Sequence, residues 1–255
     1  VYQGERVSLA EAGNTRSADP VYQHGFPQNG HQRHPGGQEE QNSRGPGSHQ
    51  QRYGSADSPD GMGRGVVMAG GISLEKYLVE HCAPTLAGLK TASMFCLPLE
   101  GEADWRGQAA HWNAVLNPKG LFLLILRRRA DRALLYLCRP SQLQRDLDCP
   151  GVEELLSRYG YPNVRAEEAL ARLRLRLEQE DGFPHEIGLF LGYPLGDVEG
   201  FIQNEGKNCK CCGCWKVYCD ELEARRRFAR MEKCRQVYAR LWSQGRSLWQ
   251  LTVAA

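Results

Sequence analysis

The chain has 255 residues, 24% of them charged, and lysines and arginines outnumber aspartates and glutamates by only two. This near balance argues against a protein built mainly to hold nucleic acid, since such proteins concentrate positive charge. The longest uninterrupted apolar run, Leu121–Leu126, has six residues, whereas a membrane-spanning helix needs about twenty. We therefore expect neither a membrane span nor a nucleic-acid partner.

The N-terminal segment, residues 1–67, is dominated by Gly, Pro, Gln, Ser, Asn and His and has no helical or strand period of apolar residues. Such a segment buries too little apolar surface to offset the loss of chain entropy. We expect residues 1–67 to be a disordered polar tail, or a start site assigned upstream of Met68, without a secretory signal. Residues 68–255 are expected to form a single cysteine-rich domain.

All ten cysteines lie beyond this tail, and six of them fall between Cys209 and Cys234. In a chain without an export signal, crowded cysteines are typical of reduced thiols or metal ligands rather than of a disulfide framework. The cysteine usage therefore predicts a cytoplasmic protein.

The first half of the domain is expected to combine helices with a small sheet. Helical spacing begins at Leu74, and Pro84 suits the first turn of a second short helix that ends near Gly88. Residues 104–116 read as a further helix, which Pro118 and Gly120 close. The expected strands are Thr91–Leu97, Leu121–Arg127 and Arg132–Arg139, the last two forming an antiparallel hairpin.

The second half is expected to be helical, because apolar residues recur there at helical intervals. The expected helices are Ser141–Leu147, Val152–Tyr159, Arg165–Glu180, Pro184–Leu191, Leu195–Asn204 and Asp220–Ser243. The fold class is therefore α+β, with a small antiparallel sheet of about three strands packed with a helical C-terminal half.

Three stretches carry a family resemblance: His81–Lys90, the segment from Phe183–Gly188 through Val198–Ile202, and Gly213–Tyr218. Together they resemble the bacterial family known as domain of unknown function 3793. The resemblance runs from about Leu74 to Val253 and leaves residues 1–67 outside it. It implies a bacterial cytoplasmic protein, but it implies no activity, cofactor or catalytic residue, because the family has none agreed.

The strongest site signal is the run Cys209–Cys214, which holds two overlapping C-x-x-C pairs, Cys209/Cys212 and Cys211/Cys214. A C-x-x-C-G turn is the knuckle that points two thiolates at zinc or iron. We expect Cys209 and Cys212 to form it, because Gly213 permits a positive φ in the turn. The wider set of metal-ligand candidates is Cys209, Cys211, Cys212, Cys214 and Cys219.

A closed tetrahedral site needs further ligands, and none of the neighbours forms a second clean C-x-x-C pair. The alternative interpretation is a cluster of reduced thiols on a surface loop. Both interpretations stay open at the level of the sequence.

His81 and Cys82 precede Pro84 and suggest a different chemistry. A thiol at the N-terminal edge of a helix, next to an imidazole, gains thiolate character and can act as a nucleophile. His81 or His185 would then serve as its base. The alternative, which we favour, is that Cys82 is a small buried apolar residue and that His81 caps a helix C-terminus.

His185 is followed by Glu186 at the start of an expected helix, where the helix dipole favours a carboxylate without any chemistry. The pair lacks a second histidine four residues on, because that position is Leu189. His185 is thus a candidate proton carrier, although a lone histidine is more often structural.

Residues 186–198 have the spacing of a helix-turn-helix, with Gly192 at the turn and Val198 packing the second helix against the first. The second helix carries Asp197 and Glu199, and such a face repels phosphates. We therefore expect this motif to serve packing rather than DNA recognition. The basic runs at 127–129 and 225–227 read as solvated faces.

Three functions compete. The first is a cytosolic accessory protein whose cysteines bind a metal or respond to redox state. The second is a regulator that uses the helix-turn-helix. The third is an interaction module that binds a protein partner without chemistry.

Overall fold

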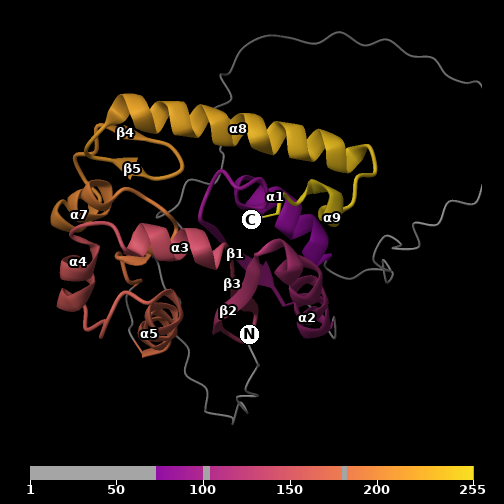
Figure 1. Cartoon of the computed structure of the whole chain (residues 1–255), viewed down its shortest axis with the longest axis horizontal. Helices are drawn as coiled ribbons and strands as arrows, with labels where there is room; N and C mark the ends of the chain where they lie inside the picture. The colour runs from indigo at the N-terminus through magenta and orange to yellow at the C-terminus, as the bar shows by residue number, and fades with distance from the viewer. Residues whose placement is uncertain (1–72, 100–103, 180–182, 255) are drawn as a thin grey trace, which may run out of the picture.

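A computed structural model describes residues 73–99, 104–179 and 183–254 of the chain (Figure 1). The expected tail, residues 1–67, lies outside the described residues. The elements are α1 (Leu74–Leu86), β1 (Ala92–Pro98), α2 (Trp105–Leu116), the 3-10 helix η2 (Asn117–Lys119), β2 (Phe122–Arg128), β3 (Arg132–Cys138), α3 (Pro140–Leu147), α4 (Val152–Arg158), α5 (Ala166–Gln179), α6 (Ile187–Phe190), α7 (Leu195–Gln203), β4 (Cys211–Cys212), β5 (Lys216–Val217), α8 (Glu221–Ser243) and α9 (Leu248–Leu251).

A three-stranded antiparallel sheet in the order β1-β3-β2 forms the centre of the described fold. In this sheet Leu135 of β3 lies opposite Phe95 of β1 and Ile125 of β2. The expected hairpin, the third strand and the α+β class are thereby confirmed. The sequence pattern did not give the strand order, which places the last strand of the three between the other two.

The middle strand, β3, is buried on both of its faces. Successive side chains of a strand point to opposite faces, and Leu135 and Leu137 enter one hydrophobic cluster whereas Leu134 and Tyr136 enter another. All four side chains are at most 4% exposed. The sheet therefore separates two cores.

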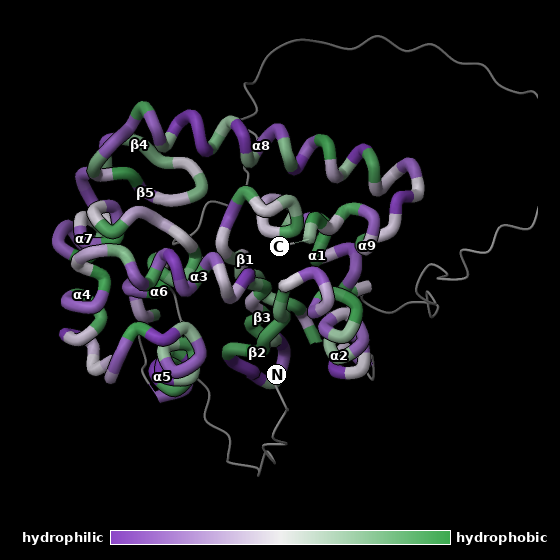
Figure 2. Tube along the Cα trace, viewed as in Figure 1, coloured by the Kyte–Doolittle hydropathy of each residue, from purple (hydrophilic) through white to green (hydrophobic). Residues whose placement is uncertain are grey.

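Helices cover both faces of this sheet. Helices α1, α2, α8 and α9 supply the first core, and α3, α4, α5 and α6 supply the second. Figure 1 shows the two groups on either side of the strands, and Figure 2 shows hydrophobic residues concentrated along the strands. None of the helices in the described ranges is long and apolar enough to cross a membrane.

Helix α1 differs from the expected pair of short helices, because it continues through Pro84. Leu78, Cys82 and Leu86 line one face of α1 and are fully buried. Burial of this face outweighs the backbone hydrogen bond that proline removes. The helix ends at Leu86, close to the predicted end near Gly88, which has a φ of 73°.

Arg139 joins the end of β3 to the end of α1 and to the C-terminal segment. Its side chain is buried, its Nε donates to the Thr85 carbonyl at 2.8 Å, and its Nη2 donates to the carbonyls of Leu86 at 2.9 Å and Val253 at 2.7 Å. The last carbonyls of a helix have no partner within the helix. Arg139 satisfies two of them.

We expect Arg139→Lys to lower the free energy of unfolding by about 2 kcal/mol, because a lysine ammonium cannot reproduce the three hydrogen bonds that the planar guanidinium donates to carbonyls of two segments. Arg132→Lys, at the exposed start of the same strand, is the matched control and should change stability by less than about 0.5 kcal/mol. Urea unfolding monitored by tryptophan fluorescence measures both. Equal effects of the two substitutions would contradict the role given to Arg139.

Candidate thiol site on the β4–β5 hairpin

The cysteine run forms a short antiparallel hairpin, in which Cys211 pairs with Val217 and Cys212 with Lys216. The hairpin lies between α7 and one end of α8 (Figure 1). Positive φ values occur in the loop that leads into it, at Glu205, Gly206 and Asn208. The sequence pattern predicted no strand in this region, so the two-stranded sheet β4–β5 adds to the expected fold.

The hairpin is anchored to α7 by Asp197, which is only 3% exposed. Its carboxylate accepts hydrogen bonds from Trp215 Nε1 at 2.7 Å and from the backbone N–H groups of Tyr218 at 2.8 Å and Cys219 at 2.9 Å. Buried carboxylates need such donors, because an unpaired buried charge is costly. Asp197 is therefore a structural anchor, and not the exposed acid of a recognition helix.

Aromatic packing fixes the other face of the hairpin. The Trp215 ring stacks on Tyr193, with centroids 4.9 Å apart, and meets Phe228 of α8 edge-on at 4.6 Å. Gly213 does not adopt the positive φ that we expected. It is required for another reason, since a Cβ at this position would lie 2.3 Å from the Phe228 ring.

The thiols of the hairpin face different neighbours, because adjacent residues of a strand point to opposite sides. Burial, and then the nearby Cys209 and Cys212, raise the pKa of Tyr218, so these two thiols share a neighbour. The Tyr218 hydroxyl is buried and has no hydrogen-bond partner among the described residues.

Cys211 and Cys219 lie in different surroundings. Partial burial raises the pKa of Cys211, which lies near Arg225 and Glu221 of α8. Partial burial and the Asp197 carboxylate raise the pKa of Cys219. Within the described ranges, no three His, Cys, Asp or Glu side chains are arranged to hold a metal ion. The five metal-ligand candidates therefore stay a prediction.

Cys214 differs from the other thiols of the hairpin because two cations lie beside it. Arg235 of α8 donates from Nη2 to Cys214 Sγ at 3.3 Å. The half-buried Lys90, in the loop after α1, is close enough for its charge to interact with Cys214 and Arg235. Tyr193 completes the site, donating from its hydroxyl to the Cys214 carbonyl at 3.1 Å.

Lys90 lies over the Tyr193 ring, with Nζ 5.2 Å from the ring centroid. Burial, together with the Arg235 cation, lowers the pKa of Lys90 to about 8, although Cys214 and Cys82 oppose the shift. Among the described residues, no carboxylate lies within 4.0 Å of Nζ. The site thus places the Arg235 guanidinium in contact with the Cys214 sulfur and a second positive charge, Lys90, in its surroundings.

The sequence did not indicate that Lys90, Tyr193 and Arg235 belong to one site. They come from three separate segments; Lys90 ends the first stretch of the family resemblance and Tyr193 lies in the helix-turn-helix spacing, but neither pattern relates them to the cysteine run. The unusual spacing of the cysteine run was the signal that pointed to this region, but the spacing drew attention to the Cys209/Cys212 pair rather than to Cys214.

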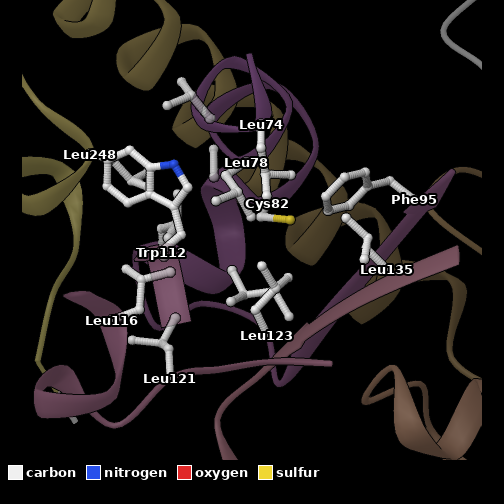
Figure 3. Packing of buried hydrophobic residues seen from close by; sticks show 14 of the residues in the cluster. Leu74, Leu78, Cys82, Phe95, Trp112, Leu116, Leu121, Leu123, Leu135 and Leu248 are labelled. Carbon is white, nitrogen blue, oxygen red and sulfur yellow. The ribbon is translucent and has the colours of Figure 1, made fainter. Parts of the chain in front are cut away.

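Cys82, a candidate nucleophile, is fully buried in the first core. Figure 3 shows it among the side chains of Leu78, Phe95 and Leu123. Burial raises the pKa of Cys82 to about 12. Because α1 continues through Pro84, Cys82 lies near the C-terminal end of a helix, where the dipole disfavours a thiolate. The geometry therefore favours the packing interpretation.

The two candidate histidines do not meet around Cys82. His81 is exposed and stacks on Phe95, with centroids 5.5 Å apart, and burial against such neighbours lowers its pKa. His185 is exposed and touches the Phe201 ring, at 5.0 Å. It precedes α6, on the opposite side of the sheet from α1. Catalytic roles for His81, Cys82 and His185 stay predictions.

The residue after His185 has a structural role that the sequence did not indicate. Glu186 is fully buried, lies 2.7 Å from Arg176 Nε and accepts a hydrogen bond from the Tyr161 hydroxyl at 3.0 Å. A buried carboxylate requires such partners. Glu186 therefore ties α6 to α5 and to the segment after α4.

The helix-turn-helix spacing produces the turn that was expected. Gly192 has a φ of 75°, and a Cβ at Gly188 would lie 2.8 Å from Val198 Cγ2, so the two helices touch. A Cβ at Gly200 of α7 would lie 2.5 Å from Tyr218. This face of the second helix is therefore covered by the hairpin.

We expect Asp197→Asn to release the hairpin from α7, because the amide NH₂ would face donors in place of an acceptor. The loss of charge-assisted hydrogen bonds should cost about 2 to 3 kcal/mol. Hydrogen exchange should show faster exchange at the Tyr218 and Cys219 amides. Glu199→Gln, on the same helix, is the control and should leave both amides protected. Unchanged protection in Asp197→Asn would refute the anchoring role.

No curated protein and no solved structure matches the chain. A family model described as "Protein of unknown function (DUF3793)" matches residues 78–252, which include the whole hairpin and the surrounding helices. The match covers more than half of the chain, and the chain therefore belongs to the DUF3793 family.

Proposed function

We propose that this chain is a redox-responsive thiol protein and that Cys214 is its oxidant-sensitive cysteine. One observation carries the proposal: the Arg235 guanidinium donates a hydrogen bond to Cys214 Sγ at 3.3 Å. Reactive cysteines are those whose sulfur lies in a positive, partly accessible environment. Cys214 is half-buried, and Lys90 adds a second positive charge.

The proposed reaction is the reduction of a hydroperoxide. The Cys214 thiolate attacks the terminal oxygen, so that an S–O bond forms and the O–O bond breaks. The sulfur loses two electrons and becomes a sulfenic acid, while the peroxide becomes an alkoxide. The alkoxide takes a proton from the Lys90 ammonium or from water and leaves as an alcohol. A thiol then attacks the sulfenic sulfur, forming a disulfide and releasing water.

The surroundings of the other cysteines support the choice of Cys214. Cys82 and Cys138 are buried thiols whose pKa burial raises to about 12, so neither supplies a thiolate near neutral pH. The pKa values of Cys211 and Cys219 are also raised. Among the described residues, Cys214 is the thiol that accepts a hydrogen bond from a cationic side chain.

We expect Arg235→Met to slow oxidation and alkylation of Cys214 roughly tenfold, since the loss of one charged hydrogen bond corresponds to about 1.4 kcal/mol. The measurement is limited labelling with iodoacetamide and with hydrogen peroxide, followed by peptide mass spectrometry that reports each cysteine separately.

Arg225→Met is the matched control, because Arg225 lies on the same helix but is paired with Glu221 and lies near Cys211. It should leave the Cys214 rate unchanged. Equal Cys214 rates in wild type, Arg235→Met and Arg225→Met would defeat the proposal. So would a wild-type Cys214 that reacts no faster than the exposed Cys149.

A second function, metal binding, is favoured by one specific observation. Cys209 and Cys212 both lie near enough to Tyr218 to influence its charge, and among the described residues the buried Tyr218 hydroxyl has no hydrogen-bond partner. Two thiols beside the unpartnered Tyr218 hydroxyl suit a thiophilic ion such as zinc or iron. The remaining ligands of a four-coordinate ion would come from solvent or from other side chains brought closer by movement of the hairpin.

For protein purified without air, we expect Cys212→Ser to remove most of any bound zinc or iron, because it breaks the knuckle pair. Cys214→Ser, two residues further along the same hairpin, is the control and should retain the metal. The measurement is elemental analysis of zinc and iron in the wild type and the two variants. Equal metal content in wild type and Cys212→Ser would rule out this pair as the metal site.

A further inference from the structure

The outer face of α8 carries a line of positive charge that the thiol site does not use. Arg226, Arg230, Lys233 and Arg240 are spaced by four, three and seven residues, which places them on one side of a helix. All four are exposed. Like charges three or four residues apart repel each other and destabilise a helix. The stability of α8 therefore does not account for this arrangement of cations.

These four cations differ from the other arginines of α8 in their pairing. Arg225, Arg227 and Arg235 each have a glutamate partner one turn earlier on the helix. Within the described ranges, by contrast, no carboxylate lies within 4.0 Å of the side chains of Arg226, Arg230, Lys233 or Arg240. Their charge is therefore available to a partner.

A shallow, open apolar groove of about 480 Å³ lies between two of these cations, Arg230 and Lys233, and the loop after α1. Its apolar lining includes Leu89 and Val237, with the side chain of Tyr238 beside them, and Arg230 and Lys233 belong to the same lining. Leu89 is 37% exposed and is one of the large apolar side chains that the described fold leaves at the surface. The surface thus combines an apolar floor with a basic edge.

We propose that this face of α8, which we call the α8 groove, binds an acidic amphipathic helix from a protein partner. Such a helix places its apolar side chains in the groove, and its carboxylates meet Arg230 and Lys233. The 23 residues of α8 offer a long and straight surface for this contact. Charge complementarity identifies the partner as acidic.

A nucleic acid fits the α8 groove less well. A phosphate backbone would use the cations but would leave Leu89 and Val237 against a polar surface, without the apolar contact that the groove offers. An anionic membrane would likewise place charged headgroups over the apolar lining. The apolar lining of the α8 groove therefore favours a protein helix over a nucleic acid or a membrane surface, which would use only the positive charges.

The test uses a fluorescent designed peptide with leucines along one helical face and glutamates on its flanks, added to the full chain. We expect saturable binding that weakens with salt. Arg230→Gln combined with Lys233→Gln should weaken it about tenfold, because two exposed ion pairs together contribute about 1.4 kcal/mol. Val237→Ser should also weaken it, since that change removes apolar contact from the groove.

The matched control is Arg225→Gln combined with Arg227→Gln, which removes the same charge from α8 at two positions outside the groove lining and should leave binding unchanged. A scrambled peptide of the same composition, a DNA duplex and vesicles containing phosphatidylserine complete the set of probes. The proposal is overturned if the designed peptide fails to bind, or if the scrambled peptide binds equally well. It is also overturned if the duplex or the vesicles bind more tightly and Val237→Ser has no effect.

Discussion

Burial of β3 on both faces is the constraint on which the described fold depends. A strand that is apolar on alternate sides needs a cover on each side. Helices α1, α2, α8 and α9 cover one face of the sheet. Helices α3 to α6, which lie between them in the sequence, cover the other face. The chain must therefore return to the first face after completing the second. Helix α8 makes that return, and Arg139 fastens the end of β3 to the end of α1 and to the C-terminal segment.

The return of α8 also creates the surroundings of the cysteine hairpin. The hairpin precedes α8 directly and has too few residues for a core of its own, so it relies on neighbours. Asp197 supplies the polar anchor from α7, and Phe228 supplies the apolar surface from α8. These two attachments orient the turn so that Cys214 meets Arg235. The chemistry proposed for Cys214 is thus a consequence of how the hairpin is held.

Helix α8 serves two proposed roles through two faces. Arg235 points from one face toward Cys214, whereas Arg230 and Lys233 border the groove on another. Adjacent positions on a helix differ in direction by about 100°, so one element can contribute to both surfaces without conflict. Because both surfaces share one rigid helix, a partner held in the α8 groove would lie close to the thiol site.

The sequence by itself determined the class of the fold, most element boundaries and the family. Those features depend on local periodicity, on turn residues such as Gly120 and Gly192, and on contiguous motifs, which a single chain displays directly. It did not determine that α1 continues through Pro84, because core packing on Leu78 and Leu86 decides that. It drew attention to the cysteine run but not to the partners of each thiol. Only the tertiary structure brought Lys90, Tyr193 and Arg235 to Cys214, since charges from three distant segments meet through packing that no local pattern encodes.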